Sequence, residues 1–309
     1  MASTSGAAPE ADKIDFSKRE LAEQYHSILG PVLFVPYAKF LSSRVAGLLQ
    51  QQHANTNTHT PIQILETACG TGIVTAAMRD ALQGLGVTFP PVHITATDLS
   101  GGMLHVAKSH LQPVAPALQC IQADMQALPY GDEIFDVIVC QFGLMFPPAK
   151  DQALKEAFRV LKHGGAFAVL VWDRIELNAV PNSAKTVFDE ILQAGHAMSI
   201  PFSLHDPVSL QKLFLDAGFY VEASEKVVRS GIVASPSHVS TSFCTFLDGF
   251  PRTAHLRSSE PDTVARVHAR LVEEIKSKVD SEGQASLSAW FYIVRKPWAQ
   301  VDRKEWCII

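Results

Sequence analysis

The stretch IQILETACGTG, residues 62–72, decides how the chain folds. Its first half is a short apolar run typical of a strand buried on both faces, and its glycines open directly into an amphipathic segment. Gly70 and Gly72 let a ligand approach the backbone, and the start of the following helix presents free N–H groups. Position 75 is threonine, so the turn lacks the third glycine of a dinucleotide-binding fingerprint.

Downstream of this turn, apolar β-branched runs alternate with helical patterns, as in βαβ units around a parallel sheet. The helix before the last of these strands is expected to follow Pro147-Pro148 and to stop at Gly164-Gly165. The expected strands are 62–68, 92–98, 118–124, 135–142 and 166–172, and the expected helices are 72–83, 101–112 and 149–163.

The flanking sequence adds a lid and a cover to this core. Two amphipathic segments, 17–29 and 36–49, precede it, and the Gly30-Pro31 pair predicts a break between them. Alternation in the run 287–297 indicates either an edge strand or a strand with an antiparallel neighbour. Helices are further expected at 183–194, 207–217 and 262–280, and a strand at 219–229.

We therefore expect an α/β fold: a doubly wound, mostly parallel sheet of seven strands with helices on both faces and a helical lid and cover. Residues 1–16 are expected to be a disordered lead, and 17–309 a single domain. Its expected parts are lid helices at 17–49, a ligand-binding core at 62–173, a substrate cover at 174–286 and a last strand at 287–297.

Composition excludes some classes of function. The 309 residues are 47% hydrophobic and 18% charged, which is typical of a globular protein. Lys and Arg number 26 against 31 Asp and Glu, and no segment is basic, which argues against a nucleic-acid partner. No apolar run is long enough to span a membrane, and no secretory signal is visible, so a cytoplasmic location is expected. Five widely spaced cysteines favour reduced thiols over a metal site, and the choice between monomer and homodimer stays open.

Polar residues at the strand ends indicate a ligand, because open α/β sheets bind ligands beyond the carboxyl ends of their strands. Asp98 ends the second strand, 26 positions after Gly72, and suits the two hydroxyls of a ribose. Asp124 and Met125 suit the amino group and ring face of an adenine, and Gln141 ends the fourth strand. Together they favour a nucleoside without a phosphate. The alternative for each is structural: capping carboxylates, a structural glutamine and core methionines.

These motifs resemble a known family. ILETACGTG, TATDLSGGML, IQADMQALPYGDEIFDVIVCQFGLMF and FRVLKHGGAFAVLVWD are similar to successive motifs of class I S-adenosylmethionine-dependent methyltransferases, within the small-molecule branch that includes ubiquinone and menaquinone C-methyltransferases. The resemblance implies a Rossmann-like fold and S-adenosyl-L-methionine as cofactor. Ala68 stands where the family usually has its first glycine. The resemblance implies that the methionine part of the cofactor is surrounded by Glu66, Gly70, Thr71 and Gly72. It implies that Asp98 holds the ribose, with Leu99 and Met103 nearby, and that Asp124 and Met125 hold the adenine. It also implies that Gln141 lines the channel toward the sulfonium.

The acceptor side carries fewer signals. Residues 25–37 resemble the N-terminal lid of these enzymes, so Tyr25, His26 and Tyr37 are candidates for positioning an acceptor, and Trp172 follows the fifth strand toward the same pocket. The alternative for each is a packing role. No metal-ligand set is visible, and the sequence identifies no catalytic base.

The expected function is methylation of the oxygen, carbon or nitrogen of a small organic acceptor, in secondary metabolism or quinone-type biosynthesis. After the fourth expected strand the chain has Cys140-Gln141-Phe142-Gly143 and not an Asn-Pro-Pro-Tyr type motif. The absence of that motif argues against an amide or nucleobase nitrogen as the methylated atom. One alternative is a protein of the same fold that binds the cofactor but catalyses cyclisation or rearrangement, or has a non-methylating role. Another is an interaction module without a cofactor.

Overall fold

The computed structural model describes residues 15–53, 60–85, 90–111 and 118–298. Its seven strands form one sheet in the order β3-β2-β1-β4-β5-β7-β6. Only β7 runs antiparallel to its neighbours, β5 and β6, so the expected seven-stranded, mostly parallel α/β fold is confirmed. The strands are β1 (Ile62–Thr67), β2 (Val92–Asp98), β3 (Leu118–Gln122), β4 (Phe135–Gln141), β5 (Leu161–Trp172), β6 (Tyr220–Ile232) and β7 (Gln284–Arg295).

The order of the strands creates a switch point between β1 and β4. In β1, Ile64 pairs with Ile94 of β2 on one side and with Val137 of β4 on the other, although the two partners are far apart in sequence. These central strands are almost wholly buried, which explains their continuous apolar character. The loops that leave β1 and β4 therefore start side by side, where such sheets bind ligands.

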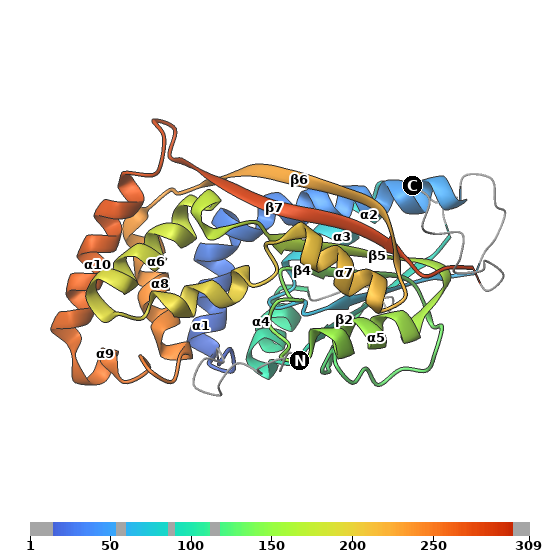
Figure 1. The fold of residues 1–309 in the computed structure, drawn as a ribbon, viewed down its shortest axis with the longest axis horizontal. Coiled ribbons are helices and arrows are strands. Elements are labelled where there is room, and N and C mark those ends of the chain that lie inside the picture. The colour runs from blue at the N-terminus through green and yellow to red at the C-terminus, as the bar shows by residue number, and fades with distance from the viewer. Residues whose placement is uncertain (1–14, 54–59, 86–89, 112–117, 299–309) are drawn as a thin grey trace, which may run out of the picture.

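Helices cover both the sheet and one end of the molecule. Figure 1 shows α6, α8, α9 and α10 gathered at one end, well away from α5. The helices of the core are α2 (Val35–His53), α3 (Ile73–Gln83), α4 (Gly101–Leu111), α5 (Lys150–Val160) and α7 (Pro207–Asp216). The helices of the cover are α6 (Ala179–Leu192), η4 (Gly195–Phe202), α8 (Pro236–Phe246), η5 (Leu247–Gly249), α9 (Leu256–Ser259) and α10 (Pro261–Lys276), and η3 (Ile175–Leu177) leads into them.

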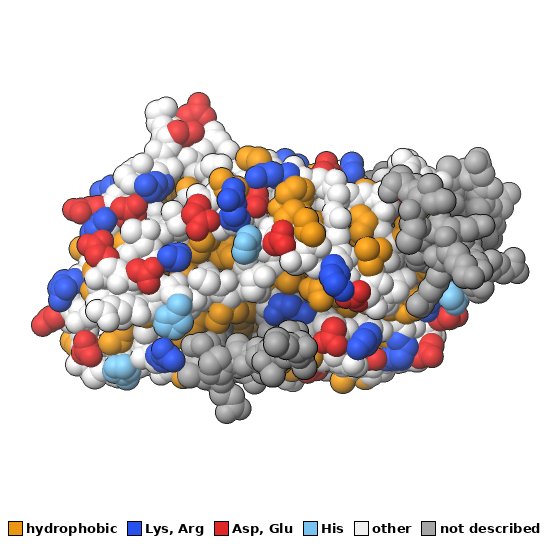
Figure 2. All heavy atoms as spheres, viewed as in Figure 1, with side chains coloured by type: hydrophobic (Ala, Val, Ile, Leu, Met, Phe, Trp, Pro, Cys, Tyr) orange, Lys and Arg blue, Asp and Glu red, His pale blue; other side chains and the backbone are white. Residues whose placement is uncertain are grey.

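Several of these helices begin where the sequence provides a cap. Asp206 accepts hydrogen bonds from the N–H groups of Val208 and Ser209 at the start of α7, and Ser235 accepts one from His238 at the start of α8. A proline occupies the first turn of each helix, where no N–H is needed. Acidic and basic side chains are intermixed over the face shown in Figure 2.

The predicted break at Gly30-Pro31 is wrong. Helix α1 (Arg19–Gln24), the π-helix η2 (Tyr25–Phe34) and α2 run on without interruption, with Pro31 inside η2. The wider π-helical turn carries the chain past the missing N–H, and the N–H of Val35 bonds to the carbonyl of Gly30. A Cβ on Gly30 would come within 2.9 Å of Ile73, so this glycine serves close packing against α3.

The predicted end of the helix before β5 is also wrong. Helix α5 ends at Val160, and Leu161 already pairs with Phe135 of β4. The register then shifts, so that Val137 pairs with Ala166 and the residues between form a bulge. Gly164 lies in this bulge with φ of 74°, so the glycines expected to stop the helix shape a strand instead.

The last strand lies inside the sheet. Of the two possibilities for the run 287–297, the antiparallel neighbour is correct and the edge is not, because β7 is flanked by β5 and β6. The edge strand on that side is β6, which falls in the range expected to form the cover.

The N-terminal segment has two notable features. Residues 1–14 of the expected disordered lead lie outside the described residues, whereas the N–H of Asp15 bonds to the carbonyl of Gly249, and Phe16 contacts three aromatic rings. The continuous helix 19–53 is long and apolar enough to cross a membrane, and 56% of its most apolar window is buried inside the fold.

Candidate functional site

The turn after β1 exposes its backbone to open space. Ala68, Gly70 and Gly72 all have φ in the left-handed region, at 52°, 55° and 81°. A Cβ on Gly70 would meet no atom within 4 Å, whereas one on Gly72 would come within 2.9 Å of Leu111. The turn therefore needs Gly72 for packing against α4 and leaves room for a ligand over Gly70.

Ala68 replaces the family's first glycine, and Gly143 accommodates it. A Cβ on Gly143 would overlap the Cβ of Ala68, so the loop after β4 can lie this close only because Gly143 has no side chain. The two turns at the switch point are thus packed against each other.

Asp98 joins the end of β2 to the glycine turn. Its Oδ2 accepts a hydrogen bond from the N–H of Gly70 at 2.7 Å, and its Oδ1 accepts one from the N–H of Ser100 at 2.8 Å. Burial raises the pKa of Asp98, and these N–H groups oppose the shift. Because each carboxylate oxygen has a second lone pair, Asp98 can still accept hydrogen bonds from a ligand.

Glu66 is buried beneath the same turn. Its Oε2 accepts a hydrogen bond from Oγ1 of Thr75 at 2.6 Å, so the residue that breaks the dinucleotide fingerprint serves to hold this carboxyl group. Burial raises the pKa of Glu66 to about 8, and the charge of Asp98 adds to the shift. Without a cation beside it, Glu66 is therefore mainly protonated at neutral pH.

The residues after β3 lie next to Asp98. The N–H of Ala123 bonds to the carbonyl of Asp98 at 3.0 Å. Asp124 accepts hydrogen bonds from the backbone and the side chain of Gln126, as a loop carboxylate does. Met125 is partly buried against the main core. The structure therefore brings Asp124 and Met125 to the edge that carries Asp98.

The two residues expected beside the ribose differ in exposure. Met103 is buried in α4 against Ala22 and Phe16, and its N–H bonds to Oγ of Ser100 at 3.1 Å. Leu99 has 65% of its surface exposed. The carbonyl of Phe16 accepts a hydrogen bond from the same Ser100 hydroxyl at 2.8 Å, so the N-terminal segment crosses the start of α4.

The end of β4 presents an amide and a stacked pair of rings. Nε2 of Gln141 donates a hydrogen bond to the carbonyl of Phe34 at 3.2 Å, and its Oε1 is buried without a partner. Phe142, with φ of 53°, stacks on Trp172 with ring centroids 3.7 Å apart and planes inclined by 2°. Neighbouring strands thus fix the orientation of one wall of the site.

The acceptor candidates fall into three places. Tyr25 stacks on Phe34 at 4.6 Å, and burial, with the charge of Asp98, raises the pKa of its hydroxyl. Nδ1 of His26 lies 3.0 Å from Oγ1 of Thr71, in the glycine turn. Tyr37 donates to the carbonyl of Val227 at 3.3 Å and is buried behind the stacked rings. Of the four candidates, Tyr25 and Trp172 line an apolar cavity.

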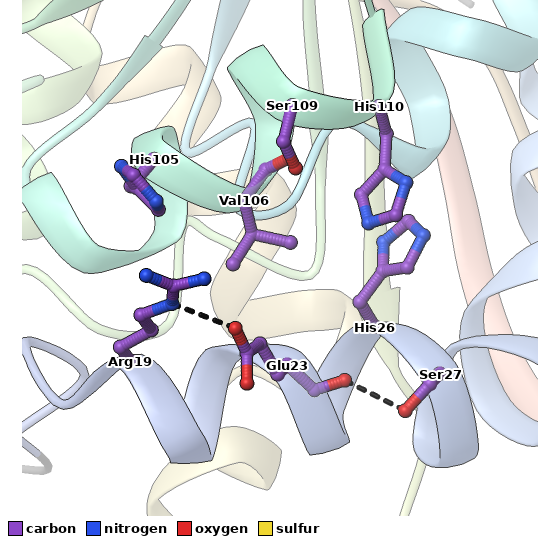
Figure 3. Close-up of a pocket in the computed structure, with 8 residues that line it drawn as sticks. All are labelled: Arg19, Glu23, His26, Ser27, His105, Val106, Ser109 and His110. Carbon is purple, nitrogen blue, oxygen red and sulfur yellow. Dashed lines mark hydrogen bonds and ion pairs between the residues drawn. The ribbon is translucent and has the colours of Figure 1, made fainter.

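That cavity, of about 60 Å³, lies between the strand ends and the cover. A second hollow of about 340 Å³ lies between α1, η2 and α4 (Figure 3). The second hollow is larger, but no described strand residue lines it, whereas the smaller cavity is lined by Phe142 and Trp172 at the ends of β4 and β5. Aromatic residues of the smaller cavity include Phe16, Tyr25, Phe34, Phe142, Phe146, Trp172, Phe202, Phe243 and Phe246.

Residues 65–169 match the sequence model of a family described as a methyltransferase domain. The chain contains a methyltransferase domain. The matched range begins in β1 and ends in β5, so it includes both loops of the switch point and the ends of β2 and β3. The resemblance of its motifs to class I methyltransferases implies S-adenosylmethionine as the cofactor.

Curated relatives match part of the chain. The ubiquinone/menaquinone biosynthesis C-methyltransferase of Bartonella tribocorum is 37% identical over 117 residues, which are 37% of this chain and 43% of that protein. The enzyme of the same name from Idiomarina loihiensis is 26% identical over 187 residues, 56% of this chain and 72% of that protein. The chain thus matches less than half the length of the first relative. The solved YcgJ protein of Bacillus subtilis covers 82% of this chain, and 98% of its own, at 17% identity and a TM-score of 0.48.

The residues present fit the cofactor. Open space over Gly70 and three carboxylates at one edge of the sheet, Glu66, Asp98 and Asp124, suit a ligand with hydroxyl groups and positive charge. The sequence did not indicate Thr75, Ser100 or Phe16 as parts of this site. The spacing of Ser100 to Met103 was a local capping signal, but the position of Phe16 depends on distant contacts.

Proposed function

We propose that this protein transfers a methyl group from S-adenosylmethionine to a small organic acceptor. The hydrogen bond of 2.7 Å between the Gly70 N–H and Asp98 carries the proposal, because it fixes a carboxylate beside a glycine turn that faces open space. Both residues lie within the matched methyltransferase domain.

The cofactor contacts are assigned to strand-end residues. We place the ribose at Asp98 with Leu99 and Met103 nearby, and the adenine at Asp124 and Met125. The channel toward the sulfonium passes Gln141. The methionine part is assigned to Glu66, Gly70, Thr71 and Gly72.

When bound, the cofactor supplies an electrophilic methyl group on a positively charged sulfur. Transfer would join the acceptor atom to the methyl carbon, leave the electron pair of the broken carbon–sulfur bond on sulfur, and require the acceptor to lose its proton, which would reach solvent when the products leave. The chain must hold the acceptor in line with the methyl group and exclude water. Phe142 and Trp172, stacked at the ends of β4 and β5, provide a rigid apolar wall for this purpose.

The acceptor is placed among small molecules of secondary metabolism or quinone-type biosynthesis, with oxygen, carbon or nitrogen as the methylated atom. Two relatives are named as C-methyltransferases of ubiquinone and menaquinone biosynthesis, which supports a carbon acceptor of that type. The acidic net charge of −5 supports an enzyme without a nucleic-acid substrate.

Transfer of a labelled methyl group tests this function. The purified chain is incubated with methyl-labelled S-adenosylmethionine and a panel of phenols, hydroquinones and amines. We expect label in an acceptor, loss of transfer in Asp98→Ala, and normal transfer in Asp151→Ala, a surface carboxylate of α5 paired with Lys155. Tight cofactor binding without transfer to the natural metabolite would favour a non-methylating member of the fold. Absence of binding would favour an interaction module.

A further inference from the structure

None of the described residues that line the apolar cavity has a charged side chain. Its walls come from the N-terminal segment, η2, the loops after β4 and β5, and the cover helices. Flat aromatic molecules pack favourably against such rings, in offset or edge-to-face geometry. A carboxylate or an ammonium group would lose its water there without gaining an opposite charge, which is costly.

One polar atom beside this cavity has no partner. Oε1 of Gln141 is buried and accepts no hydrogen bond within the described part of the chain. A buried acceptor left without a donor is unfavourable, so this atom calls for a donor that the described residues do not supply. The other half of the amide is engaged, because Nε2 donates to the carbonyl of Phe34.

Gln141 is not itself among the described residues that line the cavity, but two residues in direct contact with it are. Phe34, which accepts from its amide, and Phe142, which follows it in the chain, both line the cavity. The N–H of Phe142 bonds to the carbonyl of Leu170 at 2.8 Å, so the loop is anchored to β5. Gln141 is therefore held at the switch point by both the lid and the sheet.

We propose that the methyl acceptor is an uncharged, flat and largely apolar molecule that donates one hydrogen bond to Oε1 of Gln141. Gln141 is then a positioning residue: it fixes how the acceptor is turned relative to the methyl group. The inference rests on the proposed methyl transfer and adds to it the chemical class of the acceptor.

The cavity must open for such a molecule. Its volume of about 60 Å³ is less than the ~150 Å³ known to hold benzene in a protein cavity. Phe16 closes the cavity from a segment without helix or strand, in edge-to-face contact with Phe146 at 5.7 Å. Displacement of Phe16 would extend the cavity and would break its ring contacts with Phe146 and with Phe246 of α8, while leaving the sheet in place.

Three matched probes test the acceptor class. The full chain, saturated with S-adenosylhomocysteine, is titrated calorimetrically at pH 7 with 4-chlorophenol, 4-chloroanisole and 4-chlorobenzoate. All three share the ring, only the phenol is an uncharged donor, and the benzoate is charged. We expect the phenol to bind about tenfold more tightly than the anisole, as for one hydrogen bond to a buried group, and the benzoate to bind most weakly.

Two variants test whether the preference for the phenol over the anisole depends on Gln141. Gln141→Met removes the acceptor atom and should bring the phenol-to-anisole ratio to about one, whereas Gln119→Met, at an exposed position of β3, should leave it unchanged. A general loosening of the pocket would weaken both probes and leave their ratio intact, so the ratio separates positioning from a purely structural role.

Several results would overturn the inference: equal affinity of the native chain for phenol and anisole, an unchanged ratio in Gln141→Met, or tightest binding of the benzoate. Absence of binding by all three probes would also overturn it. If S-adenosylhomocysteine does not bind, the proposed methyl transfer fails. In that case the ratio of phenol to anisole affinity, measured without S-adenosylhomocysteine, still tests separately whether the pocket prefers an uncharged hydrogen-bond donor.

Discussion

The imidazole of His26 lies parallel to that of His110, with ring centroids 3.9 Å apart and planes inclined by 9° (Figure 3). His26 belongs to η2 and His110 to α4, and Nδ1 of His26 lies 3.0 Å from Oγ1 of Thr71. The stacked rings therefore hold the lid against the glycine turn. Such contact favours neutral rings, since two imidazolium groups at this distance would repel.

Acid should weaken this contact. Burial, and secondly the neighbouring His110, lower the pKa of His26 below 6.5, so the unfolded chain binds more protons there than the folded one. The free energy of unfolding contributed by His26 should fall as the pH drops through 6.5 toward its folded pKa. Above 6.5 the contribution is constant. Among the described residues that line this hollow, the other charged or titratable side chains are Arg19 and Glu23, which pair at 2.7 Å, and His105.

Urea denaturation at pH 5.5 and 7.5 measures this effect. The stability difference between the two pH values should be smaller in His26→Gln than in the native chain. His93→Gln, at an exposed position of β2, should behave as the native chain does. Comparing variants removes the contribution of other groups, including Glu66, whose raised pKa acts in the opposite direction. Identical pH dependence in native and His26→Gln protein would contradict the prediction.

Binding of S-adenosylmethionine should release a proton from Glu66. The pKa of Glu66 is about 8 in the free chain, and a sulfonium nearby favours the ionised carboxylate. Affinity should therefore increase as the pH rises from 6.5, by up to about tenfold per pH unit, and level off above about 8. S-adenosylhomocysteine, with a neutral sulfur, should show a shallower increase.

Calorimetry in buffers of different ionisation enthalpy detects the released proton directly. Glu66→Gln should flatten the pH dependence for S-adenosylmethionine, and Glu282→Gln, an exposed glutamate before β7, should not. Equal slopes for the two ligands would show that the sulfonium is not the cause.

Packing between Ala68 and Gly143 gives a stability prediction. Gly143→Ala would force two Cβ atoms to overlap, so we expect a loss of about 1–3 kcal/mol in the free energy of unfolding. Ala68→Gly in the same chain should restore much of it. Gly47→Ala is the matched control, because a Cβ there meets nothing within 4 Å inside α2, and it should stabilise by about 0.5–1 kcal/mol. Guanidinium denaturation measures all four chains.

Phe16 should limit the size of the acceptor. Phe16→Ala removes the ring that contacts Tyr25, Phe146 and Phe246, so binding of 2-naphthol should improve severalfold relative to 4-chlorophenol. Phe40→Ala removes a ring of similar burial that contacts Phe291, far from the cavity, and should leave the ratio unchanged. An unchanged ratio in both variants would exclude Phe16 as the limit.

Local sequence patterns were sufficient to predict most strands of the sheet. The strand 62–68 and its glycine turn could be predicted because burial on both faces requires a continuous apolar run, and left-handed backbone conformations favour glycine. Asp98 and Asp124 could be placed near each other because parallel strands end at one edge. All of this depends only on sequence neighbours and on one rule of topology.

Other features depend on partners far away in sequence. Gly30 looks like a helix breaker, but its lack of a side chain is needed for contact with Ile73. Gly164 looks like a helix stop, but pairing of Leu161 with Phe135 makes it part of a bulge. The stack of His26 on His110 joins segments 84 positions apart, and neither residue carries a local sign of it.

The place of β7 has a consequence for how the chain matures. Strand β6 pairs only with β7, and α8, α9 and α10 are made between them. During synthesis, β1 to β5 can pair as soon as they leave the ribosome, whereas β6 can join the sheet only after β7 has been made and has paired with β5. The portion to which we assign the methyl donor can therefore take shape on the ribosome before the portion to which we assign the acceptor is secured.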